Sequence, residues 1–347
     1  MNRININNFD FLRVVFATTV AIAHLIELSN VKIFQQYIIF FNTRLAIDGF
    51  FVISGFLIAK SFENSKSVKQ YIVKRIKRIV PAYVVLIIFC AVSFFIFSTY
   101  SLKNYFFNTH FLKYLVANLT FQNYIEPCLP GVFENNKICA VNGALWTIKL
   151  EEAFYLLIPI FFWLTKFKKN GIYVLGLLVY VVSITYFNYF MSLDMYKIAK
   201  QLPGALAFFV TGIIFYKKFN FFIKWKHYII LPCLILFFLE QYLFKTHLLK
   251  PMVYGFMVFY IAYNFKLLNG FGKYGDFTYG IYIYHFPVIQ IFVFLKLFSS
   301  YNAWFIGFLN LFLILILAAF SWHFLELRYL SKSRKERQKK LISKPHS

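Results

Sequence analysis

The chain has 347 residues, of which 60% are hydrophobic and only 14% are charged, and its mean hydropathy is +0.64. So few charged side chains cannot cover the surface of a soluble protein of this length. Apolar runs of about 20 residues recur along the chain, and each is long enough to cross a hydrocarbon core ~30 Å thick. The composition therefore excludes a soluble protein and predicts an all-α, polytopic integral membrane helical bundle.

About ten membrane spans are predicted, and the chain is interpreted as one transmembrane domain over residues 1–330 with a basic tail over 331–347. The spans are 9–28, 44–62, 79–99, 144–165, 171–189, 203–217, 228–244, 251–268, 278–297 and 303–325. We interpret the first as a retained helix and not as a cleaved signal peptide, since Asp10 and Arg13 interrupt its start. The segment 111–124 is too short and too polar to span, and we expect it in the interface.

The net charge of +24 would suit a nucleic-acid partner, but its distribution favours a membrane. With the N-terminus in the cytoplasm, most of the 37 Lys and Arg residues fall in loops on that side. This bias follows the positive-inside rule and predicts that both termini are cytoplasmic. The tail "RYLSKSRKERQKK" is then expected to contact anionic lipid. We expect no nucleic-acid partner and no metal, because the sequence has no metal-ligand spacing.

Ionisable residues within spans are candidates for function, because burying a charge in a bilayer is costly unless it is paired or faces a cavity. In the first span, Arg13 and His24 are eleven residues apart and share one helical face, about 16 Å apart along the axis. His24 is the candidate general base, since a neutral imidazole suits that role at physiological pH. The alternatives are an arginine that snorkels to the interface and a histidine that bonds a neighbouring carbonyl.

The second span holds Asp48, at a depth similar to that of His24 on the preceding antiparallel span. A carboxylate there is suited to orient or stabilise the His24 imidazole. A polar helix cap is the structural alternative. Just before the third span, Arg75 and Arg78 share a helical face, and Pro81 is expected to bend or start the membrane helix. Paired guanidiniums suit a phosphate ligand, although a positive-inside anchor would look the same.

The fourth span begins "LWTIKLEEAFYLLIP" and carries Lys149, Glu151 and Glu152 near its predicted outer end. One glutamate can face a cavity while the other pairs elsewhere, because adjacent helical residues point about 100° apart. A buried ion pair between Lys149 and Glu152 is the alternative. These charges lie at the predicted depth of His24 and Asp48, which indicates one polar cavity open to the outside.

Two further features complete the sequence. Cys128 and Cys139 share the long outer loop before the fourth span, and a disulfide is expected there if the loop faces an oxidising compartment; two free thiols are the alternative. His285 lies within the ninth span, two residues before Pro287.

These residues also form a set of spaced motifs over nearly the whole chain, and by them the sequence resembles the acyltransferase-3 family of integral membrane O-acyltransferases. An Arg-x10-His motif falls on Arg13 and His24, and a DxFFVxSGFL motif on Asp48–Leu57. The remaining motifs are RxxRIxPxY on Arg75–Tyr83, W-[ST]-x3-E-E-x-F-Y-x3-P on Trp146–Pro159, and an SYxIYLxHxP-like motif on Thr278–Pro287.

The resemblance implies transfer of an acyl group, most often acetyl, from acyl-coenzyme A to a sugar hydroxyl outside the cytoplasm. The acceptor would be a surface polysaccharide such as O-antigen, or a lipid-linked oligosaccharide, and the location the bacterial cytoplasmic membrane. Acetyl-CoA is then the donor, with its phosphates on Arg75 and Arg78. The catalytic set would be His24, Asp48, Glu152 and Arg13, with His24 either base or transient acyl carrier. The substrate pocket would include Glu151, Trp146, Tyr155 and His285.

Two other functions use similar residues. A proton-coupled transporter or a flippase for a sugar-linked lipid would relay protons through His24, Asp48 and Glu152, but the sequence has no internal repeat of the kind on which many transporters are built. A polysaccharide polymerase or ligase would use the outward-facing charges but not the paired arginines. A purely structural scaffold gives no reason for buried charges at one depth.

Overall fold

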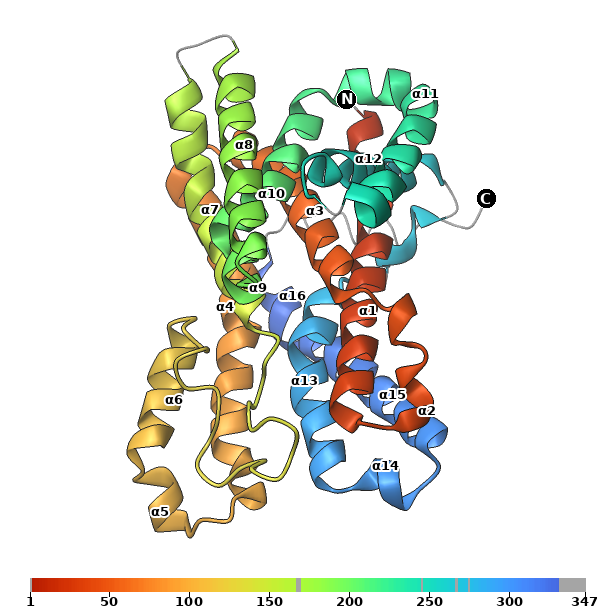
Figure 1. Cartoon of the computed structure of the whole chain (residues 1–347). Coiled ribbons are helices and arrows are strands. Elements are labelled where there is room, and N and C mark those ends of the chain that lie inside the picture. Colours follow the sequence, from red (N-terminus) through yellow and green to blue (C-terminus); the bar gives the residue numbers. More distant parts are fainter. Residues whose placement is uncertain (1, 167–169, 245, 266–267, 274, 331–347) are drawn as a thin grey trace. The chain divides into compact units, whose positions relative to one another are not determined.

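The structure is a computed structural model that describes residues 2–330, apart from 167–169, 245, 266–267 and 274. Helices dominate the described residues, which contain no β-strand and one isolated bridge between Ser98 and Val132 (Figure 1). The predicted all-α class is therefore confirmed. The basic tail predicted over 331–347 lies outside the described residues.

The chain forms two compact units, each assembled from three separate stretches of sequence. Unit 1 contains residues 1–13, 44–73 and 150–271, and unit 2 contains 14–43, 74–149 and 272–347. The helices α1, Phe9–Ser29, α4, Val68–Ser93, and α7, Trp146–Thr165, each contribute residues to both units.

Unit 1 is built on α3 and on the consecutive helices α8 to α12 from the middle of the chain. These are α3, Thr43–Glu63, α8, Gly171–Ser192, α9, Tyr196–Ala199, α10, Leu202–Lys217, α11, Phe219–Phe238, a π-helix, Leu239–Phe244, and α12, Lys250–Asn264. Glycines let α3 and α10 touch along their backbones: a Cβ on Gly55 would lie 1.9 Å from the carbonyl oxygen of Phe209. A side chain larger than hydrogen at Gly55 would therefore push the two helices apart.

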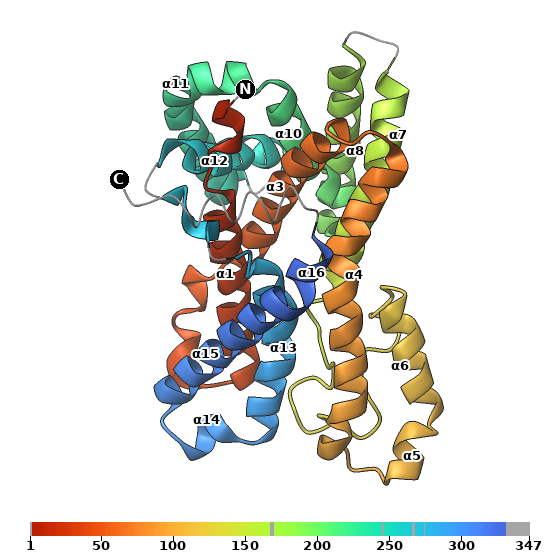
Figure 2. The same ribbon diagram turned by 180° about the vertical axis from the view of Figure 1, so that it is seen from behind.

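Unit 2 contains the remaining helices and a long irregular loop over residues 120–145 (Figures 1 and 2). Its elements are α2, Lys32–Gln35, α5, Leu102–Phe106, α6, Thr109–Leu119, α13, Thr278–Phe294, α14, Leu297–Ser300, α15, Ala303–Ser321, a π-helix, Trp322–Glu326, and α16, Leu327–Tyr329. Helices α13 and α15 pack closely, because a Cβ on Gly280 would lie only 2.6 Å from the Cα of Ala318.

Seven helical segments among the described residues are long and apolar enough to cross a membrane. They cover seven of the ten predicted spans: 9–29, 43–63, 68–97, 171–192, 196–217, 219–243 and 303–329. The other three predicted spans correspond to α7, which carries three charges near its start, and to the shorter α12 and α13. The chain is thus a multi-pass membrane protein, while the count of ten and the orientation of the termini stay predictions.

The third predicted span needs a correction. Its helix begins at Val68, eleven residues before the predicted start, and runs through Pro81 without a break. A proline is tolerated inside a membrane helix where surrounding groups satisfy the freed backbone carbonyl. Arg75 and Arg78 therefore lie on a continuous helix, and not in a segment that precedes it.

Candidate active site

Two histidines from distant parts of the sequence meet in unit 2. His24 lies on α1 and His285 on α13, and the Nδ1 atom of His24 is 2.8 Å from the Nε2 atom of His285. The ring planes differ by only 4° and their centroids are 5.1 Å apart. The distance between the centroids exceeds the distance between the bonded nitrogens by about two ring radii. Both nitrogens must therefore lie close to the line that joins the centroids, so the rings lie edge to edge in one plane. This is the geometry of a ring-to-ring hydrogen bond.

The two rings differ in burial. His285 is completely buried, and its Nδ1 atom is 3.1 Å from the backbone oxygen of Ile281, one helical turn earlier. His24 is only partly buried. Phe286 contacts the His24 ring edge-on, with centroids 5.3 Å apart. His24 is therefore the more exposed member of the pair, and His285 is the fully buried one.

The loop that precedes α7 docks on α13 next to His285. Asn142 donates its side-chain amide to the backbone oxygen of Ile283 at 2.8 Å, and Thr147 shares a 2.5 Å hydrogen bond with the hydroxyl of Tyr282. The Tyr282 ring in turn contacts the His285 ring, with centroids 5.8 Å apart. Thr147 is adjacent to the predicted pocket residue Trp146, which begins α7. The pocket residues at the start of α7 are thus tied to the helix that carries His285.

One turn and a half farther along α13, Gln290 anchors the middle of the same loop. Its side chain is fully buried and donates to the backbone oxygens of Ile138 and Ala140 at 2.8 and 2.7 Å. Asn136 donates back to the side-chain oxygen of Gln290 at 3.0 Å. A buried amide with its donors and acceptor satisfied fixes the loop backbone firmly.

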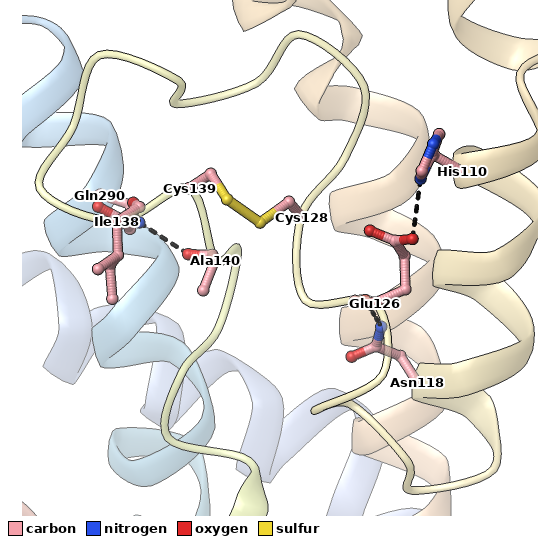
Figure 3. The surroundings of a disulfide bond; sticks show 8 residues. All are labelled: His110, Asn118, Glu126, Cys128, Ile138, Cys139, Ala140 and Gln290. Atoms are coloured by element: carbon pink, nitrogen blue, oxygen red, sulfur yellow. Dashed lines mark hydrogen bonds and ion pairs between the residues drawn. A yellow bond between two sulfur atoms is a disulfide. The ribbon is translucent and has the colours of Figure 1, made fainter.

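A disulfide closes this loop. Cys128 and Cys139 are bonded, with their Cα atoms 5.4 Å apart, which is the pairing expected from the sequence (Figure 3). On the far side of the bond, Asn118 of α6 donates to the backbone oxygen of Glu126, whose carboxylate pairs with His110 at 2.9 Å. The loop is therefore held by α13 at one end, by α6 at the other, and by a covalent bond between.

Arg78 lies in a buried ionic cluster, also in unit 2. Its guanidinium is 2.5 Å from the carboxylate of Asp276 and 3.9 Å from that of Glu326, and all three side chains are at least nine-tenths buried. Glu326 ends the π-helix after α15 and also accepts a hydrogen bond from Ser321. Arg78 is thus compensated by two carboxylates that the sequence analysis did not connect with it, whereas the neighbouring Arg75 is only partly buried.

Asp48 lies in unit 1, where it is fully buried on α3. The Nε atom of Arg44, one turn earlier, is 3.0 Å from both carboxylate oxygens of Asp48. The guanidinium also lies over the ring of Phe187, 4.9 Å from its centroid. Sequence reasoning missed Arg44 as the partner, although the i, i+4 spacing is a sufficient signal.

The opening turns of α7 carry the remaining predicted residues. Tyr155 donates a 2.5 Å hydrogen bond to Glu151, one turn earlier, and the hydroxyl of Tyr71 bonds the backbone oxygen of Tyr155. Glu152 is partly buried, and its Oε1 atom accepts no hydrogen bond from the described residues. Lys149 directs its ammonium at the ring of Tyr124, 4.4 Å from the centroid, and not at a carboxylate.

The predicted catalytic set is divided between the units. His24 belongs to unit 2, while Arg13, Asp48 and Glu152 belong to unit 1, as does the predicted pocket residue Glu151. Their convergence on one cavity therefore stays a prediction. Within the described ranges, no group of three or more His, Cys, Asp or Glu side chains could hold a metal ion.

A multi-pass helical membrane protein that places a hydrogen-bonded histidine pair beside an anchored loop has the parts of a membrane-embedded enzyme. The chain belongs to the acyltransferase-3 family: residues 6–324 match the family's acyltransferase domain model. The chain is thus an acyltransferase.

Individual relatives agree with this assignment. The chain is 27% identical to an O-acetyl transferase of Shigella phage Sf6 over 94% of this chain and 97% of the relative. It is 26% identical to the peptidoglycan O-acetyltransferase OatA of Listeria monocytogenes, over 71% of this chain and 45% of the relative. Nodulation protein 10 of Rhizobium leguminosarum is 28% identical over 44% of this chain and 43% of the relative. No solved structure matches the chain.

Proposed function

We propose that the protein is a membrane O-acetyltransferase that moves an acetyl group from cytoplasmic acetyl-CoA to a hydroxyl of an extracytoplasmic or lipid-linked sugar. The observation that carries the proposal is the His24–His285 pair, in which a partly exposed imidazole is held by a fully buried one. The two relatives named as O-acetyltransferases support acetyl as the group transferred, and the peptidoglycan enzyme supports a saccharide acceptor. The bacterial cytoplasmic membrane is the proposed location.

In the proposed reaction, His24 removes the proton of the acceptor hydroxyl as its oxygen attacks the thioester carbonyl. The carbon–oxygen bond forms, the carbon–sulfur bond breaks, and the proton on His24 passes to the leaving thiolate, which departs as coenzyme A. A variant of this route, in which His24 itself carries the acetyl group between donor and acceptor, uses the same residue. Arg13, Asp48, Glu151 and Glu152 keep their predicted roles around the substrates as part of this proposal.

The donor phosphates are assigned to the basic face of α4. Arg78 is paired with Asp276 and Glu326, so its charge is largely balanced within the protein. We assign the direct phosphate contact to Arg75. Arg78 has the role of holding α4 to the segment before α13, which carries Asp276, and to the π-helix that ends at Glu326. The acidic neighbours would repel a phosphate placed on Arg78 itself.

The test uses purified protein in liposomes with acetyl-CoA labelled on the acetyl group. Wild type should bind the donor and release or transfer the label. His24→Ala should keep donor binding and lose turnover by about 10²–10⁴-fold, the usual contribution of a general base. Arg75→Ala should weaken donor binding while its turnover at saturating donor persists. Full turnover in His24→Ala, or no binding and no turnover in wild type, would refute the proposal, and substrate flux without coenzyme A would favour a transporter.

A further inference from the structure

The hydrogen bonds of His285 determine where its proton lies. The backbone oxygen of Ile281 can only accept, and it is 3.1 Å from the Nδ1 atom of His285. That nitrogen must therefore carry the hydrogen. In a neutral imidazole the other nitrogen then has the lone pair. The Nε2 atom of His285, which faces His24, is thus an acceptor.

A second proton on His285 would make the ring a cation, and its surroundings oppose this. The side chain is completely buried, and the two groups at its ring nitrogens are a backbone carbonyl and another imidazole. Neither partner is a carboxylate that could balance a charge, and an uncompensated ion in an apolar interior is very costly. The ring of His285 is therefore neutral, and its Nε2 atom accepts the hydrogen bond.

The donor of the 2.8 Å hydrogen bond must then be the Nδ1 atom of His24. We infer that His285 is a positioning residue that fixes His24 in the tautomer protonated on Nδ1, so that the lone pair for catalysis lies on Nε2. This inference rests on the proposed function, because it names the nitrogen of His24 that takes the acceptor proton. It also identifies His285 as a support of the base, where the sequence had placed it in the substrate pocket.

The arrangement is related to the carboxylate–histidine pair of serine hydrolases, with a neutral imidazole in place of the carboxylate. When Nε2 of His24 takes the proton of the acceptor hydroxyl, the ring becomes a cation and its Nδ1–H becomes a stronger donor. The hydrogen bond to His285 then shortens and stabilises the His24 cation. The charge nevertheless stays on His24, because transfer to His285 would place it in the fully buried site. His24 consequently keeps the proton where it can be returned to the leaving thiolate.

Packing holds the His24 ring in the plane that this bond requires. Phe286, the residue after His285, presses edge-on against His24. The loop residue Gly143 makes room for it, since a Cβ there would lie 2.8 Å from the Phe286 ring. A hydrogen bond and an aromatic contact from α13 thus hold the ring of His24.

Two variants separate the hydrogen bond from the bulk of the side chain. In His285→Gln the amide oxygen reaches the place of Nε2 and keeps an acceptor for His24, while in His285→Asn the same amide is one methylene shorter and does not reach. We expect His285→Asn to lose about 10²–10⁴-fold in kcat, with the KM for acetyl-CoA unchanged. His285→Gln should keep about tenfold more kcat than the Asn variant. His110→Gln, a histidine substitution elsewhere in unit 2, is the matched control.

The tautomer itself is measured by nitrogen NMR on protein labelled with ¹⁵N in the histidine rings, of which the chain has 7. The His24 signals, assigned by their loss in His24→Ala, should show a protonated Nδ1 in wild type and in His285→Gln. In His285→Asn they should change to a mixture that includes protonated Nε2. A wild-type His24 protonated on Nε2, or full kcat in His285→Asn, would overturn the inference. The NMR measurement of the tautomer does not require turnover. If the spectra are as expected but the protein transfers no acetyl group, the proposed function is rejected while the tautomer assignment stands.

Discussion

The two units solve the problem of burying polar groups in different ways. In unit 2, His24 and His285 join helices 261 residues apart through a hydrogen bond between two rings. In unit 1, Asp48 is fully buried as well, but its partner Arg44 lies one turn away on the same helix. One arrangement connects two helices and leaves a reactive ring partly exposed, while the other neutralises a charge locally.

The difference teaches which buried group takes its hydrogen-bond partner from a distant helix. Asp48 and Arg44 form their ion pair within one helix, and Phe187 of α8 packs against the guanidinium. His24 depends on α13 for both its hydrogen-bond partner and its aromatic contact. The hydrogen bond of His24 can therefore change when a substrate alters the packing of α1 on α13. An ion pair within one helix is less sensitive to such a change.

Breaking the local pair should have the largest effect on stability. Arg44→Met leaves the buried Asp48 carboxylate without its close cation, and we expect a loss of about 3–5 kcal/mol in the free energy of unfolding. Thermal and denaturant unfolding of the protein in detergent would measure it.

The double variant Arg44→Met/Asp48→Asn is the control, because it removes both charges together. It should recover most of the lost stability, since replacing a whole buried pair is far less costly than removing one partner. If Arg44→Met were as stable as wild type, Lys250, the other cation whose charge acts on Asp48, would be the residue that balances it.

The next effect concerns the loop that supports the histidine helix. Cys128→Ser/Cys139→Ser removes a bond across 11 positions of sequence, and loops of this size gain about 2–4 kcal/mol from a disulfide. Because Gln290 still anchors the loop on α13, we expect lower thermal stability with little change in kcat. Gln290→Leu, which keeps the disulfide but removes the anchor, is the matched comparison. A large loss of kcat in the cysteine variant alone would show that the covalent bond, and not Gln290, positions the loop beside His285.

Local spacing explains most of what could be predicted from the sequence. The apolar runs predict the helices, and the two cysteines in one short loop predict the disulfide. The Arg44–Asp48 and Glu151–Tyr155 pairs are both i, i+4. Such contacts depend on helix geometry alone and can therefore be derived without the fold.

Contacts between distant helices could not be derived in this way. Arg78 meets Asp276 across 198 residues, and no periodicity within α4 indicates that its guanidinium is already paired. The same holds for His24 and His285, which had been placed in different parts of the site. The start of the third span was placed too late for a local reason. Pro81 was expected to bend or start the helix, whereas the helix begins at Val68 and continues through it.

The smallest predicted effect is a pH dependence of stability, which arises from a partly buried histidine of unit 1, His247. His247 lies in the loop between the π-helix of unit 1 and α12, against the ring of Phe187 at 4.1 Å. Burial, followed by the charges of Lys250 and Arg44, lowers the pKa of His247 to about 3. Between about pH 6.5 and 3 the unfolded chain therefore binds a proton that the folded protein does not. This contribution to stability is complete above pH 6.5 and is lost as the pH falls towards 3.

The measurement is the thermal unfolding temperature in detergent at pH 7.5 and at pH 5. Wild type should lose stability at the lower pH, and His247→Phe, which keeps an aromatic contact with Phe187 but cannot titrate, should lose less. His227→Phe is the control, since that histidine is exposed beside Tyr260. Equal losses in wild type and His247→Phe would mean that protonation elsewhere, for instance of the carboxylates, sets the pH dependence. A smaller loss in His247→Phe would show that the folded protein excludes a cation at His247, as burial and then the charges of Lys250 and Arg44 predict.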